Sequence, residues 1–111
     1  MGKKLLILLL MLAASLCAAQ QTPKPTGYVS DFAGVIEPAY AQRIEGVARA
    51  LQEKTGAQIA VVTVRSVAPY GSIEQYAVDL AAEWGVGEAG RDNGVLLLLA
   101  MDERRIRLEV G

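Results

Sequence analysis

Carboxylates and hydroxyls are the side chains with which this sequence could do chemistry. It contains no histidine, and its one cysteine, Cys17, lies in the N-terminal segment. Cys–His and Ser–His–Asp catalysis, and zinc sites built on His or Cys, are therefore excluded for the rest of the chain. An Asp-x-Asp-x-Thr motif for phosphoryl transfer is also absent. The hard oxygen ligands that remain suit calcium or magnesium.

An Asp-Asn-Gly segment at residues 92–94 is a candidate cation site. It ends a glycine-rich loop and precedes an apolar run. One interpretation is an ordinary turn, since Asn-Gly adopts positive φ at little cost. The other is a hard-cation site in which Asp92 and the side-chain oxygen of Asn93 contribute ligands. The segment is not an EF-hand, because apolar residues follow where further oxygen ligands would be required. Both interpretations stay open.

Other acidic residues have simpler structural explanations. Asp31 stands between a proline-containing segment and a predicted helix, where an aspartate commonly accepts hydrogen bonds from backbone N–H groups of a turn. Asp102 and Glu103 follow an apolar run, which favours a solvated hairpin turn over a metal site. A cation site needs at least three converging oxygen ligands. Asp102 and Glu103 are only further candidates for such a site.

Residues 1–19 are typical of a secretory signal peptide. Two lysines precede the apolar run Leu5–Leu12, and small residues fit cleavage after Ala19. We therefore expect export to the periplasm, the cell envelope or the extracellular space. Two alternatives stay open, an uncleaved membrane anchor and lipidation of Cys17, although the leucine directly before that cysteine disfavours lipidation.

Charge and length restrict what the remaining chain can be. Cleavage would remove two of the eleven basic residues and no acid, leaving 92 residues with a net charge of −3. A mildly acidic chain lacks the basic field that nucleic-acid binding needs, and this length supports one modest core. We expect an extended linker at residues 20–27, which contain Pro23 and Pro25, and a single domain at residues 28–111.

Apolar periodicity predicts two helices. From Pro38 to Lys54 the large apolar residues recur at helical spacings of four, three and four. Gly56 is placed to end this helix, and Pro38 suits its first turn. A second apolar stripe runs from Ile73 to Trp84, with Ser72 in position to cap it.

Three segments are predicted to be strands. Residues 59–64 are apolar on both faces, which indicates a buried strand in a sheet between helices. Residues 94–101 form a second apolar strand. Residues 104–110 alternate, which predicts a half-covered strand antiparallel to its predecessor through a hairpin. The apolar face of this last strand carries Ile106, Leu108 and Val110.

The order of these elements predicts the fold class. Strand–helix–strand implies a right-handed parallel crossover, and the final hairpin adds an antiparallel strand. We therefore expect a small mixed-sheet α/β sandwich with helices packed on the sheet. Because one sheet face would be left bare, we also expect the sequence to be the front part of a longer domain.

Five segments in register resemble the TPM domain family, which occurs in YgcG-like bacterial envelope proteins and in thylakoid-lumen proteins of photosystem repair. Together they span nearly all of the chain after residue 27. They are VSDFAGVI at 29–36, KTGAQI at 54–59, WGVG at 84–87, DNGVLL at 92–97 and EVG at 109–111.

The resemblance implies a small α/β sandwich and adds expectations about function. It implies that Asp31 is a metal ligand, which we pair with Asp92 and Asn93 in a calcium or magnesium site. The leading hypothesis is an exported binding or assembly module of the cell envelope, with an envelope or membrane protein complex as partner. The alternative is a metal-dependent acid phosphatase that uses the same carboxylates on phosphate monoesters. A third possibility is a scaffold without a working cation site.

Overall fold

The computed structural model describes residues 22–87 and 91–111, which form four strands and two helices. The signal-peptide prediction lies outside this part. No helix among these residues is long and apolar enough to cross a membrane. In chain order the elements are β1 (Val29–Asp31), α2 (Pro38–Thr55), β2 (Gln58–Val64), α3 (Ile73–Trp84), β3 (Gly94–Ala100) and β4 (Arg105–Val110).

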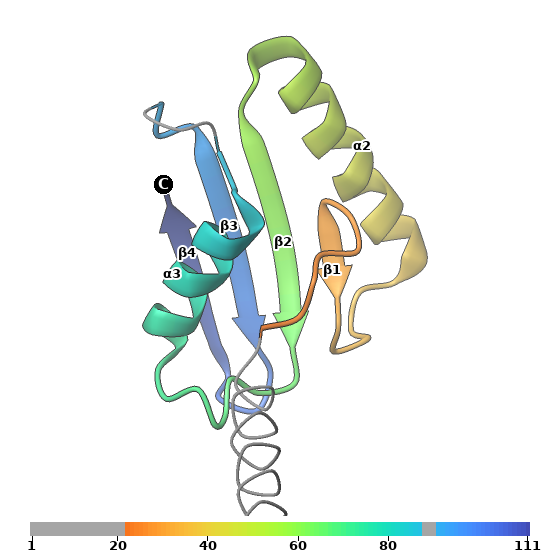
Figure 1. Cartoon of the computed structure of the whole chain (residues 1–111). Coiled ribbons are helices and arrows are strands. Elements are labelled where there is room, and N and C mark those ends of the chain that lie inside the picture. Colours follow the sequence, from red (N-terminus) through yellow and green to blue (C-terminus); the bar gives the residue numbers. More distant parts are fainter. Residues whose placement is uncertain (1–21, 88–90) are drawn as a thin grey trace, which may run out of the picture.

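The four strands form one mixed sheet in the order β1-β2-β3-β4 (Figure 1). β1, β2 and β3 are parallel, and β4 returns antiparallel to β3. The predicted α/β class, the parallel β2–β3 pair and the closing hairpin are therefore confirmed. β1 was not predicted as a strand, because three residues are too few to show a period-two pattern.

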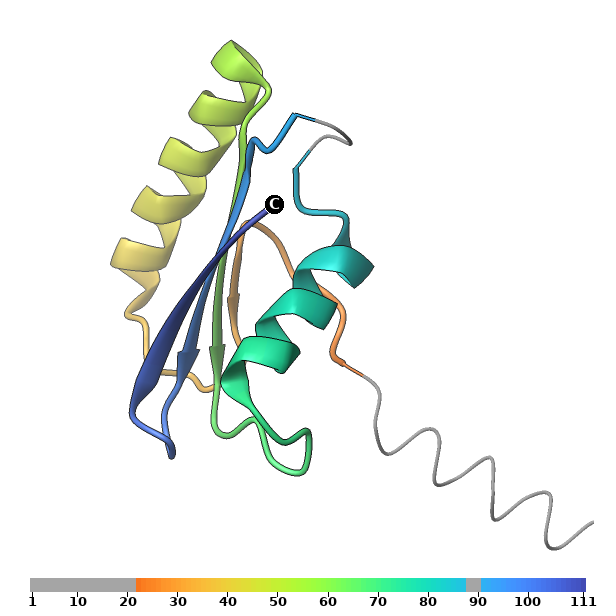
Figure 2. The ribbon, with the colours of Figure 1, turned by 90° about the vertical axis from the view of Figure 1, so that its left-hand side faces the viewer.

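The helices lie on opposite faces of the sheet, as Figure 2 shows. β2 is consequently sandwiched, which explains why the sequence is apolar on both of its faces. The main core lies on the α3 side, where Leu80 of α3 meets Val62, Leu96 and Leu98 of the sheet. These four side chains have no exposed surface.

The two helical connections have opposite hands. The chain steps from β1 to β2 and from β2 to β3 in the same direction, yet it passes over opposite faces through α2 and α3 (Figures 1 and 2). The β2-α3-β3 crossover is right-handed, as predicted. The β1-α2-β2 connection is therefore left-handed, an uncommon arrangement.

The end of α2 and the start of α3 lie at the residues that the sequence predicts. α2 ends at Gly56, whose φ of 79° is the left-handed conformation that glycine adopts without strain. α3 begins after Ser72, whose hydroxyl accepts a hydrogen bond from the Gln75 amide at 3.1 Å. This N-cap satisfies one of the amides that a helix start leaves unpaired.

One face of the sheet is covered only in part. α2 packs on β1 and β2 and leaves the same face of β3 and β4 uncovered. On β4 the side chains of Ile106, Leu108 and Val110 are 68%, 55% and 58% exposed. Their neighbours across the β3 ladder are also apolar, so the bare face is continuous across both strands.

Candidate functional site

The Asp31 carboxylate ends β1 and organises the turn that leads to α2. Its Oδ1 accepts hydrogen bonds from the Val35 amide, at 3.0 Å, and from the Thr63 hydroxyl. Its Oδ2 accepts one from the Ile36 amide at 2.9 Å. Both carboxylate oxygens therefore have partners within the chain, in the pattern of an aspartate that caps a turn.

Thr63 connects this turn to the buried sheet. The Thr63 side chain is fully buried, accepts a hydrogen bond from the Ala33 amide at 3.2 Å and donates one to Asp31. Desolvation by itself would raise the pKa of the Asp31 carboxyl, but the hydrogen bonds from Thr63, Ile36 and Val35 outweigh it and lower that pKa. The hydrogen bonds of the folded protein thus stabilise the ionised form of the Asp31 carboxylate.

The pair Asp92 and Asn93 lies in the loop before β3. Asp92 is exposed and has a φ of 49°, a left-handed conformation that Asp and Asn tolerate better than most residues. The Asn93 carbonyl accepts a hydrogen bond from the Gln58 amide at 2.9 Å, and its side-chain amide donates to the Gly56 carbonyl at 3.3 Å. Asn93 therefore joins the start of β3 to the start of β2.

Asp31 and the pair Asp92 and Asn93 lie at opposite ends of the sheet. Asp31 is level with Thr63, whereas Gly94, which follows the pair, is level with Gln58. Five residues along β2 separate these levels, or roughly 16 Å at the usual rise of a strand. One cation therefore cannot bridge both positions. Among residues 22–87 and 91–111, no three acidic side chains are grouped closely enough to hold a metal ion.

Glu103 fastens the β3–β4 hairpin to the end of β2. Its Oε2 accepts hydrogen bonds from the Ser66 hydroxyl at 2.6 Å and the Val67 amide at 3.2 Å. The hydrogen bond from Ser66 is the main reason why the pKa of the Glu103 carboxyl is lowered. Asp102 is exposed beside it. The hairpin turn is as predicted, but Glu103 has a bonding role that sequence reasoning missed.

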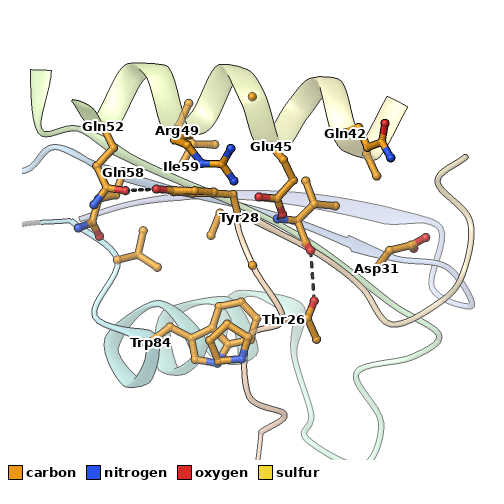
Figure 3. Close-up of a pocket in the computed structure, with 17 residues that line it drawn as sticks. Thr26, Tyr28, Asp31, Gln42, Glu45, Arg49, Gln52, Gln58, Ile59 and Trp84 are labelled. Carbon is orange, nitrogen blue, oxygen red and sulfur yellow. Dashed lines mark hydrogen bonds between the residues drawn. The ribbon is translucent and has the colours of Figure 1, made fainter. Parts of the chain in front are cut away.

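A groove of about 1100 Å³ runs beside the β1 edge of the sheet, between α2 and the end of α3 (Figure 3). It exists because β1 is shorter than β2. β1 pairs only with Val61–Thr63, so the edge of β2 from Gln58 to Ala60 has no neighbouring strand and lines the groove. The other wall is provided by polar side chains of α2.

Aromatic and polar groups line the walls of this groove. The Tyr28 hydroxyl donates to Gln52 of α2, and the Val29 amide donates to the Glu45 carboxylate at 2.7 Å. The Trp84 indole donates to the Pro23 carbonyl at 2.9 Å and so holds residues of the expected linker beside α3. Arg49 also lines the groove, and no described residue forms a hydrogen bond or ion pair with its guanidinium.

Sequence reasoning did not find this groove. Its lining combines residues from the linker, β1, α2, β2 and the end of α3, which the sequence does not show to be neighbours. The only available signal was the polar stripe Gln42, Glu45, Arg49 and Gln52 on the predicted first helix. This spacing of three and four places the side chains on one helix face.

Comparison with known proteins identifies the family. Residues 29–111 match the TPM domain model. The solution NMR structure of the N-terminal domain of a protein from P. gingivalis is similar, with 37% identity and a TM-score of 0.68. The match covers 78% of this chain and 54% of that one, so the present chain spans about half the length of that structure. No curated protein matches. The chain therefore belongs to the TPM domain family.

Proposed function

We propose that this TPM domain is an exported binding or assembly module of the cell envelope. In this proposal the groove beside β1 holds an extended segment of an envelope protein. The observation that carries the proposal is the uncovered edge of β2 inside the groove.

Backbone groups at this edge are available to a peptide. The Val61 amide donates to the Tyr28 carbonyl, so the backbone N–H and C=O of Val61 point toward β1. Because residues two apart in a strand face the same neighbour, the N–H and C=O of Ile59 also point to that side, beyond the start of β1. An extended segment could extend the β1 line there by strand addition, a common mode of peptide recognition.

Side chains in the groove favour an acidic segment. Arg49 offers a guanidinium that no described residue occupies, and guanidinium groups bind carboxylates through two parallel hydrogen bonds. Tyr28 and Trp84 offer apolar ring surface of the kind common at binding surfaces, while their polar tips donate to Gln52 and Pro23. These features support recognition of a peptide that carries an aspartate or glutamate.

Divalent-cation binding is a separate proposal. Because Asp31 and Asp92 lie at opposite ends of the sheet, such a site would use ligands from one end alone. The exposed Asp92 carboxylate is the better candidate, because both oxygens of Asp31 already accept hydrogen bonds. Solvent or a partner protein would have to complete the ligand set there.

Site-specific photo-crosslinking in cells tests the binding proposal. A photoreactive residue at Gln42, which lines the groove, is expected to give a discrete protein adduct. The matched control is the same residue at Ala39, which is exposed on α2 but does not line the groove. Arg49→Ala should weaken the adduct at position 42, whereas Lys54→Ala should not. Equal labelling from positions 42 and 39 would contradict the proposal.

A further inference from the structure

We propose that β4 is a self-association edge, at which two copies of this chain pair antiparallel about a twofold axis through Leu108. The proposal concerns the edge of the sheet opposite the groove and is independent of the function proposed above. It rests on the direction of the β4 backbone groups, on the order of charges along β4 and on the contrast between the two edges.

No strand among residues 22–87 and 91–111 pairs with the outer side of β4. Gly94 and Gly111 exchange two hydrogen bonds of 3.0 Å, one from each amide to the carbonyl of the other. In an antiparallel ladder such pairs alternate, so Glu109, Arg107 and Arg105 also bond to β3. The N–H and C=O groups that point away from the sheet therefore belong to Ile106, Leu108 and Val110.

These three residues can pair with the same residues of a second copy. With Leu108 opposite Leu108 of the second copy, Ile106 lies opposite Val110, and up to six backbone hydrogen bonds form. The apolar side chains then lie beside one another on the bare face. Pairing uses only the edge, so it is compatible with any element that covers that face.

Charges on the other face select this register. Arg107 and Glu109 already contact each other along β4 at 3.0 Å. With Leu108 on the axis, Arg107 of each copy lies directly opposite Glu109 of the other, and opposite charges across strands stabilise pairing. A shift by two residues would place Arg107 opposite Arg107, or Glu109 opposite Glu109. The sequence of β4 therefore complements itself in one antiparallel register.

At the opposite edge of the sheet, the outer side of β1 itself is blocked, which distinguishes β1 from β4. β1 has three residues, and its outward amide at Val29 is occupied by the Glu45 carboxylate. The Val29 carbonyl accepts a hydrogen bond from the Thr26 hydroxyl at 3.2 Å. β4 has six residues, no proline and exposed apolar side chains. An edge of this length without proline is a template for another strand, and its charged side chains restrict which strand can pair with it.

Cysteine crosslinking of the full chain measures the register. Single cysteines are introduced at Leu108 or Ile106 in a Cys17→Ser background, and a bis-maleimide with a span of about 8 Å is added. Directly opposite residues in such a pair lie about 5.5 Å apart, so Leu108→Cys should crosslink to itself. Two copies of Ile106→Cys would be four residues out of register, roughly 13 Å apart, and should not. Mixing Ile106→Cys with Val110→Cys should restore crosslinking.

Charge reversal tests the same pairing by an independent measurement. By symmetry, Glu109→Arg creates two like-charge contacts and is expected to weaken dimerisation about tenfold or more in sedimentation equilibrium. Adding Arg107→Glu restores opposite charges and should restore dimerisation. Concentrations of roughly 100 µM are appropriate, because a single strand pair is a small interface. Circular dichroism of each variant checks that it is folded.

Four outcomes would overturn the proposal. The chain could remain monomeric throughout this concentration range, or Ile106→Cys could crosslink to itself as readily as Leu108→Cys. The double charge variant could also fail to recover dimerisation while folded. A heteromeric adduct at Leu108 in place of the dimer would likewise reject self-pairing and assign the edge to another protein.

Discussion

Replacement of Asp31 by asparagine separates a structural carboxylate from a metal ligand. Asp31→Asn keeps one carbonyl-type oxygen for Thr63 and Val35, but it places an NH₂ group where the Ile36 amide donates. If the carboxylate is structural, this change should destabilise the fold even when no divalent cation is present. The matched control is Asp92→Asn, because Asp92 is exposed and asparagine tolerates its positive φ.

The expected size follows from the hydrogen bonds that are lost. One acceptor of an ionised group disappears, and the partly exposed position reduces its contribution, so we expect Asp31→Asn to cost about 1–2 kcal/mol in the free energy of unfolding. For a domain of this size the melting temperature should fall by roughly 5–15 °C. Asp92→Asn should change the free energy of unfolding by less than about 0.5 kcal/mol.

The pH dependence provides a second signature of the same bonds. Because the pKa of Asp31 is lowered in the folded state, its contribution is fully present above the unfolded pKa of about 3.9. That contribution is lost as the pH falls through the lower folded-state pKa. The difference in stability between wild type and Asp31→Asn should therefore shrink in strongly acidic solution, whereas Asp92→Asn should follow wild type.

Thermal melts in the presence of a chelator, with and without added calcium, provide the assay. Equal melting of wild type and Asp31→Asn in the chelator would refute the structural role of the carboxylate. A loss of stability that appeared only with calcium would instead support metal ligation by Asp31.

Further predictions address calcium binding at the Asp92 loop, the phosphatase alternative and two glycines. Millimolar calcium that binds only the folded state should raise the melting temperature of wild type but not of Asp92→Asn. In an aryl-phosphate assay with calcium or magnesium, hydrolysis by wild type should equal that by the Asp31→Asn/Asp92→Asn double variant; turnover lost in the double variant would support the phosphatase alternative. Gly94→Ala should prevent folding or strongly lower the melting temperature, because its Cβ would lie 2.5 Å from the Val86 carbonyl oxygen. Gly46→Ala has open space on a helix and should stabilise the protein by about 0.5–1 kcal/mol.

The regular elements could be predicted because their signals are local. Helical spacing, the Ser72 cap and the glycine at position 56 define α2 and α3 within a residue or so. Apolar runs and alternation likewise identified β2, β3 and β4. The strand β1 was not predicted, because its three residues show no strand pattern and are defined as a strand only by their pairing with β2.

The candidate sites could not be predicted in the same way, because they depend on which ends of the strands meet. Asp31 ends one parallel strand and Asp92 precedes another, so parallel pairing separates them along the sheet. The groove arises from helices on opposite faces, which the apolar run at residues 59–64 indicates, and from unequal strand lengths, which have no local sequence signal.

The sequence by itself determined the exclusion of histidine and cysteine chemistry after the N-terminal segment, the element order, the α/β class and the TPM resemblance. These depend on residue types and on short-range periodicity, which are fully present in the linear chain. Only the tertiary structure decided which helix covers which part of the sheet and that Asp31 accepts hydrogen bonds from the turn that follows it. It also decided that Glu45 occupies the outward amide of β1, whereas no strand among the described residues pairs with the outer side of β4. Those properties arise from contacts between residues far apart in sequence, which form only when the sheet and helices pack.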